Sequence, residues 1–150
     1  MRTPTHIVIH HSLTKDGATV SWAAIEKFHR ETHGWRDIGY HAGVEVVTPL
    51  EDLKAYRYQA LFGRAPYDVA AACPQGRMNE VGLHVCCVGN FDVEVPAPEM
   101  YACLVKRIVI PWRRQYGIAT ERIKGHHDFN SAKSCPGANF SLELVRRMSA

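Results

Sequence analysis

Short runs of β-branched residues alternate with helix-type segments along this chain, and this alternation constrains the fold more than any other feature. Residues 6–11 contain Ile7-Val8-Ile9, and residues 81–89 form a second apolar run, which is typical of buried strands. Residues 98–116 carry apolar side chains at helical spacing. The sequence therefore predicts an α/β fold: one domain with a central mixed β-sheet flanked by helices.

Local signals predict the remaining elements. Gly34 marks the end of one helix, and Ser141 has the side chain expected of an N-cap. Pro111 lies inside the helix at 98–116 and should kink it. The other expected elements are helices at 21–33 and 141–148, strands at 40–48, 53–58 and 122–124, and a long surface loop at 63–80 that is rich in glycine and proline.

Composition narrows the class of protein. A chain of 150 residues suits a single catalytic domain over 1–150, and a net charge of +3 is too small to indicate a nucleic-acid partner. No apolar run approaches the roughly 20 residues of a membrane helix, so no membrane insertion is expected. The first residues lack the pattern of a signal peptide, which predicts synthesis in the cytoplasm. Five cysteines at irregular spacing do not form a disulfide framework.

The pair His10-His11 ends the first strand, and side-chain alternation separates its two members. Neighbouring residues of a strand point to opposite faces of the sheet. His11 shares a face with Ile7 and Ile9, whereas His10 shares one with Val8. This parity favours His10 as the residue that faces a cleft and His11 as the residue that packs against the core.

A second polar cluster runs from Gly125 to Gly137 and contains His126, His127 and Cys135. Zinc binds neutral imidazole and thiolate readily, and three protein ligands leave a fourth position open for water, as in catalytic sites. Two histidines and Cys135 could supply such a site, with either His126 or His127 as the second imidazole. The alternative is that the histidines are ordinary surface or core residues and that Cys135 is a buried thiol.

Three motifs resemble those of a known family. They are Ile7-Val8-Ile9-His10-His11-Ser12, then Gly34-Trp35-Arg36-Asp37-Ile38-Gly39-Tyr40-His41, then Gly125-His126-His127-Asp128 followed by Lys133-Ser134-Cys135-Pro136-Gly137. In this order they are similar to the N-acetylmuramoyl-L-alanine amidases of the phage endolysin type, relatives of the peptidoglycan recognition proteins. The motifs cover almost the whole chain.

The resemblance implies a site and a reaction. It implies Zn²⁺ held by His10, His126 and Cys135, with Tyr40 and Lys133 assisting catalysis. The implied substrate is peptidoglycan, cut at the amide bond between N-acetylmuramic acid and L-alanine. Among neighbouring residues, Asp128 is expected either to orient a zinc-bound imidazole or to cap a turn.

Two other functions fit the same fold. One is a non-catalytic module that binds peptidoglycan, a branch usually marked by loss of the cysteine ligand; the other is an amidase that recycles soluble muropeptides. Cys135, Lys133 and Tyr40 are all present, which favours hydrolysis of the intact wall. We expect a monomer that reaches the cell wall after release from the cytoplasm, as a phage endolysin or a delivered effector does.

Overall fold

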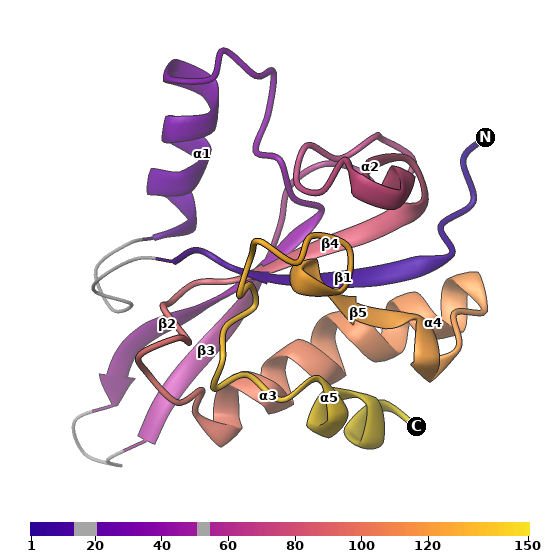
Figure 1. Cartoon of the computed structure of the whole chain (residues 1–150). Helices are drawn as coiled ribbons and strands as arrows, with labels where there is room; N and C mark the ends of the chain where they lie inside the picture. Colours follow the sequence, from indigo (N-terminus) through magenta and orange to yellow (C-terminus); the bar gives the residue numbers. More distant parts are fainter. Residues whose placement is uncertain (14–20, 51–54) are drawn as a thin grey trace.

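The computed structural model describes residues 1–13, 21–50 and 55–150. Strands and helices alternate along the chain, as the sequence predicts, and Figure 1 shows their arrangement. In chain order the elements are β1 (His6–His11), α1 (Trp22–Glu31), β2 (Ala42–Leu50), β3 (Ala55–Phe62), α2 (Met78–Val81), β4 (Gly82–Cys87), α3 (Pro98–Leu104), α4 (Ile110–Tyr116), β5 (Ile123–Gly125) and α5 (Leu142–Ser149). Short 3-10 turns lie at Gln75–Arg77, Thr120–Arg122 and His126–Asp128.

The five strands form one sheet in the order β3-β2-β4-β1-β5. β2 and β3 pair antiparallel, whereas β2–β4, β4–β1 and β1–β5 pair parallel. The sheet is therefore mixed, as predicted. β1 lies between β4 and β5, so both of its edges are hydrogen-bonded, and the register of β1 on β4 runs without a shift from His6 opposite Gly82 to His11 opposite Cys87.

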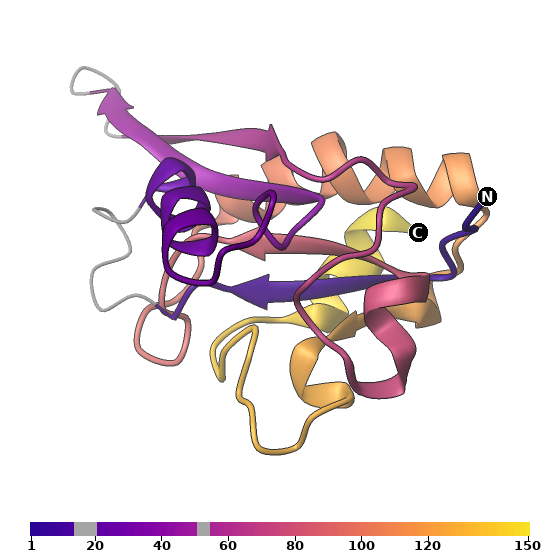
Figure 2. The same ribbon diagram turned by 90° about the horizontal axis from the view of Figure 1, so that it is seen from above.

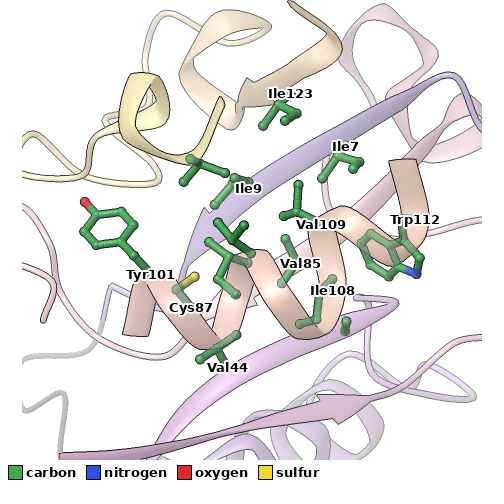
Figure 3. Close-up of a cluster of buried hydrophobic side chains, with 14 of the residues drawn as sticks. Ile7, Ile9, Val44, Val85, Cys87, Tyr101, Ile108, Val109, Trp112 and Ile123 are labelled. Carbon is green, nitrogen blue, oxygen red and sulfur yellow. The ribbon is translucent and has the colours of Figure 1, made fainter. Parts of the chain in front are cut away.

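One face of the sheet packs on α3, α4 and α5, which lie together on that side (Figures 1 and 2). Alternate strand residues and one side of the helices fill the space between them (Figure 3). This main core includes Ile7 and Ile9 of β1, Val85 and Cys87 of β4, Val44 of β2, Ile123 of β5, and Tyr101, Leu104, Ile108, Val109 and Trp112 of the helices. Burial of these apolar side chains is the main source of stability for such a layer.

The opposite face of the sheet carries smaller apolar clusters and most of the buried histidines. Val8 packs with Cys73 and Met78, and Cys86 packs with Trp22 and Ile38. α1 and α2 lie on this side (Figures 1 and 2). Thus Cys86 and Cys87, adjacent in sequence, serve different clusters because their side chains alternate across β4.

The long helix differs from its prediction at Pro111. Residues Val105–Val109 form a π-helical turn between α3 and α4, and Pro111 lies at the start of α4. Proline has no N–H and crowds the carbonyl four residues earlier, and the wider π turn relieves both problems. The perturbation expected at Pro111 thus includes a π turn just before it, and one helical ribbon runs from α3 through this turn into α4 (Figure 1).

The predicted loop at 63–80 is wrong in its last part, where a 3-10 turn and α2 occur. Gly76 and Arg77 have positive φ values of 60° and 58°, which begin the turn into α2. The Asn79 side chain then accepts hydrogen bonds from the backbone N–H groups of Ala72 and Cys73 at 2.9 and 2.8 Å. This side-chain acceptor ties the loop to α2, which a composition rule does not predict.

Serine side chains cap two helices, and the N-cap predicted at Ser141 is confirmed. Ser21 accepts a hydrogen bond from Ala24 N at 3.1 Å, and Ser141 accepts one from Leu144 N at 3.0 Å. β3 begins at Ala55, so the first two residues of the strand expected at 53–58 lie outside the described residues. No helix within the described ranges is long and apolar enough to span a membrane.

Candidate metal centre

β1 presents its two final histidines to different sides, as the parity argument predicts. His11 lies on the core side, where its ring stacks on Phe91 and its Nδ1 accepts a hydrogen bond from Phe91 N at 3.1 Å. His10 points to the other face and is 2% exposed. The backbone N–H of His11 still reaches that side and donates to Cys135 Sγ at 3.3 Å.

His10, His126 and Cys135 come together although they lie at opposite ends of the chain. One potential ligand atom of each lies within 4.8 Å of the others, and the structure shows one such group among the residues it describes. Cys135 Sγ is 3.7 Å from His10 Nδ1, and the rings of His10 and His126 are 4.9 Å apart. His127, the alternative ligand, lies outside the group and is exposed, with its Nε2 3.6 Å from Asp128 Oδ1.

The donor set fits a zinc ion. Among the described side chains, His126 Nε2 is the one buried nitrogen or oxygen without a hydrogen-bond partner. A buried polar atom left without a partner costs free energy, so such an atom indicates a missing ligand. Two imidazoles and a thiol are the ligand types that zinc prefers, and three of them leave one position open.

A 3-10 turn at His126–Asp128 positions the second imidazole. Asp128 Oδ2 accepts a hydrogen bond from Gly125 N at 2.8 Å, and His127 N donates to Cys135 O at 2.9 Å. Of the two roles expected for Asp128, the structure thus shows the turn cap. A Cβ on Gly125 would lie 2.7 Å from Pro136 Cδ, so the two ends of the loop can meet because residue 125 is glycine.

Asp92 fixes the other end of this loop. Its carboxylate accepts hydrogen bonds from Ser134 Oγ at 2.6 Å and from Ala138 N at 2.9 Å. The Ser134 hydroxyl, followed by the Ala138 N–H, lowers the pKa of Asp92 below its usual value. Gly137 packs against Phe91 so closely that a Cβ would lie 2.5 Å from the Phe91 carbonyl carbon. Cys135 is therefore held between two fixed points.

Burial keeps the three cluster residues uncharged when no cation is bound. It raises the pKa of Cys135 to about 12, against the opposing effects of the His11 N–H and the Lys133 charge. Burial also lowers the pKa of His10, with further contributions from His84 and His126, and it lowers the pKa of His126, assisted by Lys133. Neutral imidazoles with free lone pairs are the form that binds metal.

Tyr40 and Lys133 lie at two sides of this cluster. The Tyr40 ring is 5.3 Å from that of His10. Burial, followed by the Cys86 and Cys135 thiols, raises the pKa of Tyr40 well above its usual value. Lys133 is exposed on the 126–137 loop, and its charge lowers the pKa values of His126 and Cys135.

Sequence reasoning assigned no role to two buried histidines behind the cluster, His41 and His84. His84 Nδ1 lies 2.9 Å from His10 Nε2, and the backbone N–H of His84 donates to His41 Nδ1 at 2.9 Å. Both rings are buried, which lowers the pKa of His84 to about 3 and that of His41 to about 4. The available signal was one histidine inside the apolar run at 81–89, on the same side of the strand as Cys86.

Solved structures with a similar fold include endolysins and peptidoglycan recognition proteins. The endolysin N-acetylmuramoyl-L-alanine amidase LysCS from Clostridium intestinale is 23% identical, with a TM-score of 0.77 over 98% of this chain and 84% of that one. The Ph2119 endolysin of a Thermus scotoductus bacteriophage is 21% identical, with a TM-score of 0.75 over 100% and 87%. Drosophila PGRP-LB is 20% identical, with a TM-score of 0.73 over 96% and 81%.

The family itself follows from the sequence match. The family model described as N-acetylmuramoyl-L-alanine amidase, Amidase_2, matches residues 1–138, and the chain belongs to this family. The three motifs that suggested the resemblance therefore identified the family correctly. No curated protein sequence matches the chain significantly.

Proposed function

We propose that this protein is a zinc-dependent amidase that hydrolyses the bond between N-acetylmuramic acid and L-alanine in peptidoglycan. The observation that carries the proposal is the cluster of His10, His126 and Cys135, with the unpartnered Nε2 of His126 inside it. Membership of the amidase family supports the reaction class. Keeping the thiol ligand argues against the non-catalytic alternative.

Zn²⁺ would be held by His10, His126 and Cys135. When bound, it supplies a Lewis acid and lowers the pKa of a coordinated water to about 7. The chain prepares this site by keeping both imidazoles neutral and by directing the His11 N–H at the Cys135 sulfur, which favours the thiolate. The site therefore needs little rearrangement to accept a cation.

Lys133 and Tyr40 have complementary roles in the proposed reaction. Lys133 puts a fixed positive charge beside the cluster, where it stabilises negative charge that develops on the carbonyl oxygen of the scissile amide. Tyr40 keeps its proton at neutral pH, because burial raises its pKa. Its hydroxyl can therefore donate a hydrogen bond or a proton near His10.

The substrate assignment rests on chemistry shared with structural neighbours. A variant of Drosophila PGRP-LB has been solved in complex with tracheal cytotoxin, and the LysCS and Ph2119 proteins are named as endolysins. We therefore propose a muramyl peptide in the polymeric wall as the partner. We also propose that the protein is a monomer that acts outside the cytoplasm.

Product analysis tests the reaction directly. Purified wall sacculi incubated with the zinc-loaded protein should release stem peptides that begin with L-alanine, detected by mass spectrometry, without new reducing sugar ends. Chelation should stop this release, and added zinc should restore it. Binding to sacculi without any released peptide would favour the non-catalytic module instead, and cleavage restricted to soluble muropeptides would favour the recycling enzyme.

A further inference from the structure

His84 is a buried imidazole in the middle of β4, with its side chain on the sheet face that carries His10. It is 0% exposed. Both of its ring nitrogens have partners: Nε2 lies 2.8 Å from the backbone oxygen of Met78, and Nδ1 lies 2.9 Å from His10 Nε2. The ring therefore links the start of α2 to the first histidine of the metal cluster.

The directions of these two hydrogen bonds follow from the Met78 partner. A backbone carbonyl oxygen only accepts, so His84 Nε2 must carry a hydrogen. The ring is neutral, because a buried cation whose ring partners are both uncharged would be costly. A neutral imidazole with a hydrogen on Nε2 has its lone pair on Nδ1, which must then accept from His10 Nε2.

The same reasoning determines which nitrogen of His10 carries the hydrogen. If His10 Nε2 carries the hydrogen, its lone pair is on Nδ1, the nitrogen that lies 3.7 Å from Cys135 Sγ. We propose that His84 is a positioning residue that fixes this form of His10, so that the Nδ1 lone pair faces His126 and Cys135. The inference rests on the metal site of the proposed function and adds to it a residue outside the ligand set.

The surroundings of His84 fix its own orientation. Its backbone N–H donates to His41 Nδ1 at 2.9 Å, and His41 Nε2 lies 3.0 Å from the Asp68 carbonyl oxygen, so the same carbonyl argument fixes the His41 form. Met78 is placed by α2, which Asn79 ties to the preceding loop. Because hydrogen bonds to fixed backbone groups orient this network, the lone pair of His10 is fixed before any cation arrives.

The metal-free wild-type protein provides the first test. Nitrogen-15 NMR of the histidine rings should show the His10 hydrogen on Nε2, with a scalar coupling across the hydrogen bond to His84 Nδ1. This readout needs neither metal nor catalysis. A His10 ring with its hydrogen on Nδ1 would overturn the inference. Failure of this protein to bind zinc would instead overturn the proposed function and leave the assigned form of His10 intact.

Two variants separate the two hydrogen bonds of His84. His84→Asn keeps an acceptor near the position of Nδ1 and loses the partner of Met78, whereas His84→Gln keeps a donor near the position of Nε2 and loses the acceptor for His10. We expect His84→Gln to weaken zinc binding about 10- to 100-fold in a chelator competition assay, the usual cost of losing a partner of a metal ligand. His84→Asn should retain most of the affinity.

The comparison of these variants distinguishes positioning from simple packing. A packing role alone predicts that both variants lose stability in thermal unfolding and that neither changes the His10 ring signals selectively. His6→Gln serves as a control, because it removes a histidine of β1, the strand that also carries His10, and the Nδ1 of His6 contacts Thr5 and not the cluster. Equal zinc affinities for wild type and His84→Gln, with an unchanged His10 signal, would refute the proposal.

Discussion

The two faces of the central sheet are built from the same strands, but one forms the apolar core and the other carries the candidate site. On the α3–α4–α5 side, Ile7, Ile9, Val85 and Cys87 enter a continuous apolar core. On the other side, positions one residue away carry His10, His84 and Cys86, together with a network of hydrogen bonds. The difference shows that alternation along a strand can assign folding and chemistry to separate faces without a second domain.

Two cysteine substitutions, one on each face of the sheet, should give the largest difference in activity. Cys135→Ala removes the thiol of the cluster and should reduce release of stem peptides from sacculi to background, because two imidazoles hold zinc poorly. Cys103→Ala, on α3, removes a thiol from the core side and should leave the activity of the folded protein unchanged. Zinc content by elemental analysis should fall in the first variant alone. Full activity of Cys135→Ala would contradict the site.

Truncating a side chain in the core should lower stability and leave catalysis unchanged. Ile108 is 0% exposed and packs in the main core, so Ile108→Ala should lower the free energy of unfolding by about 2–5 kcal/mol through lost burial and a cavity. Urea denaturation measures this change. Arg107→Ala alters the preceding, exposed residue and should stay within about 0.5 kcal/mol of wild type. Below the unfolding transition, we expect both variants to keep wild-type kcat.

Lys133 tests whether the charge beside the cluster acts in catalysis. Lys133→Ala should lower kcat about 10²-fold, the usual cost of losing a group that stabilises charge in the transition state. Its stability should hardly change, because the side chain is exposed. Lys106→Ala, an exposed lysine of the helical layer, is the matched control. A fall in zinc affinity with unchanged kcat would assign Lys133 to metal binding instead.

Sequence patterns predicted the core face more completely than the site face. Strand parity assigned His10 to the cleft side and His11 to the core side, and the family motifs brought together three residues that the fold places side by side. The first inference rests on periodicity, which is a local property, and the second rests on the family resemblance. They do not require knowledge of which loop packs against which strand.

What the sequence did not reveal depends on partners distant along the chain. In the sequence, His84 is a single polar residue in an apolar run. Its role depends on hydrogen bonds to the Met78 carbonyl on α2 and to the His10 ring on β1. Asp92 likewise ties down a loop more than 40 residues away through Ser134, with nothing in its neighbours to indicate it. The π turn before Pro111 shows that a proline signal predicts a perturbation but not the form that the helix adopts.

The last expected difference between the faces is in pH dependence. Burial lowers the pKa of His41 to about 4 from an ordinary value of 6.5. Between these two values the unfolded chain binds a proton at His41 that the folded chain does not, so stability falls as the pH falls. Once the pH has fallen below both pKa values, this difference at His41 lowers the free energy of unfolding by at most about 3 kcal/mol.

Urea unfolding at pH 7 and at pH 4.5 measures this loss in wild type, His41→Gln and Ile108→Ala. His41→Gln should lose less stability on acidification than wild type, because one proton-binding group has gone from both states. Ile108→Ala should be less stable than wild type by the same amount at both pH values, since it removes no titratable group. If wild type and His41→Gln lost the same free energy of unfolding on acidification, His41 would not set the acid sensitivity of the fold, which would then come from other groups such as His84.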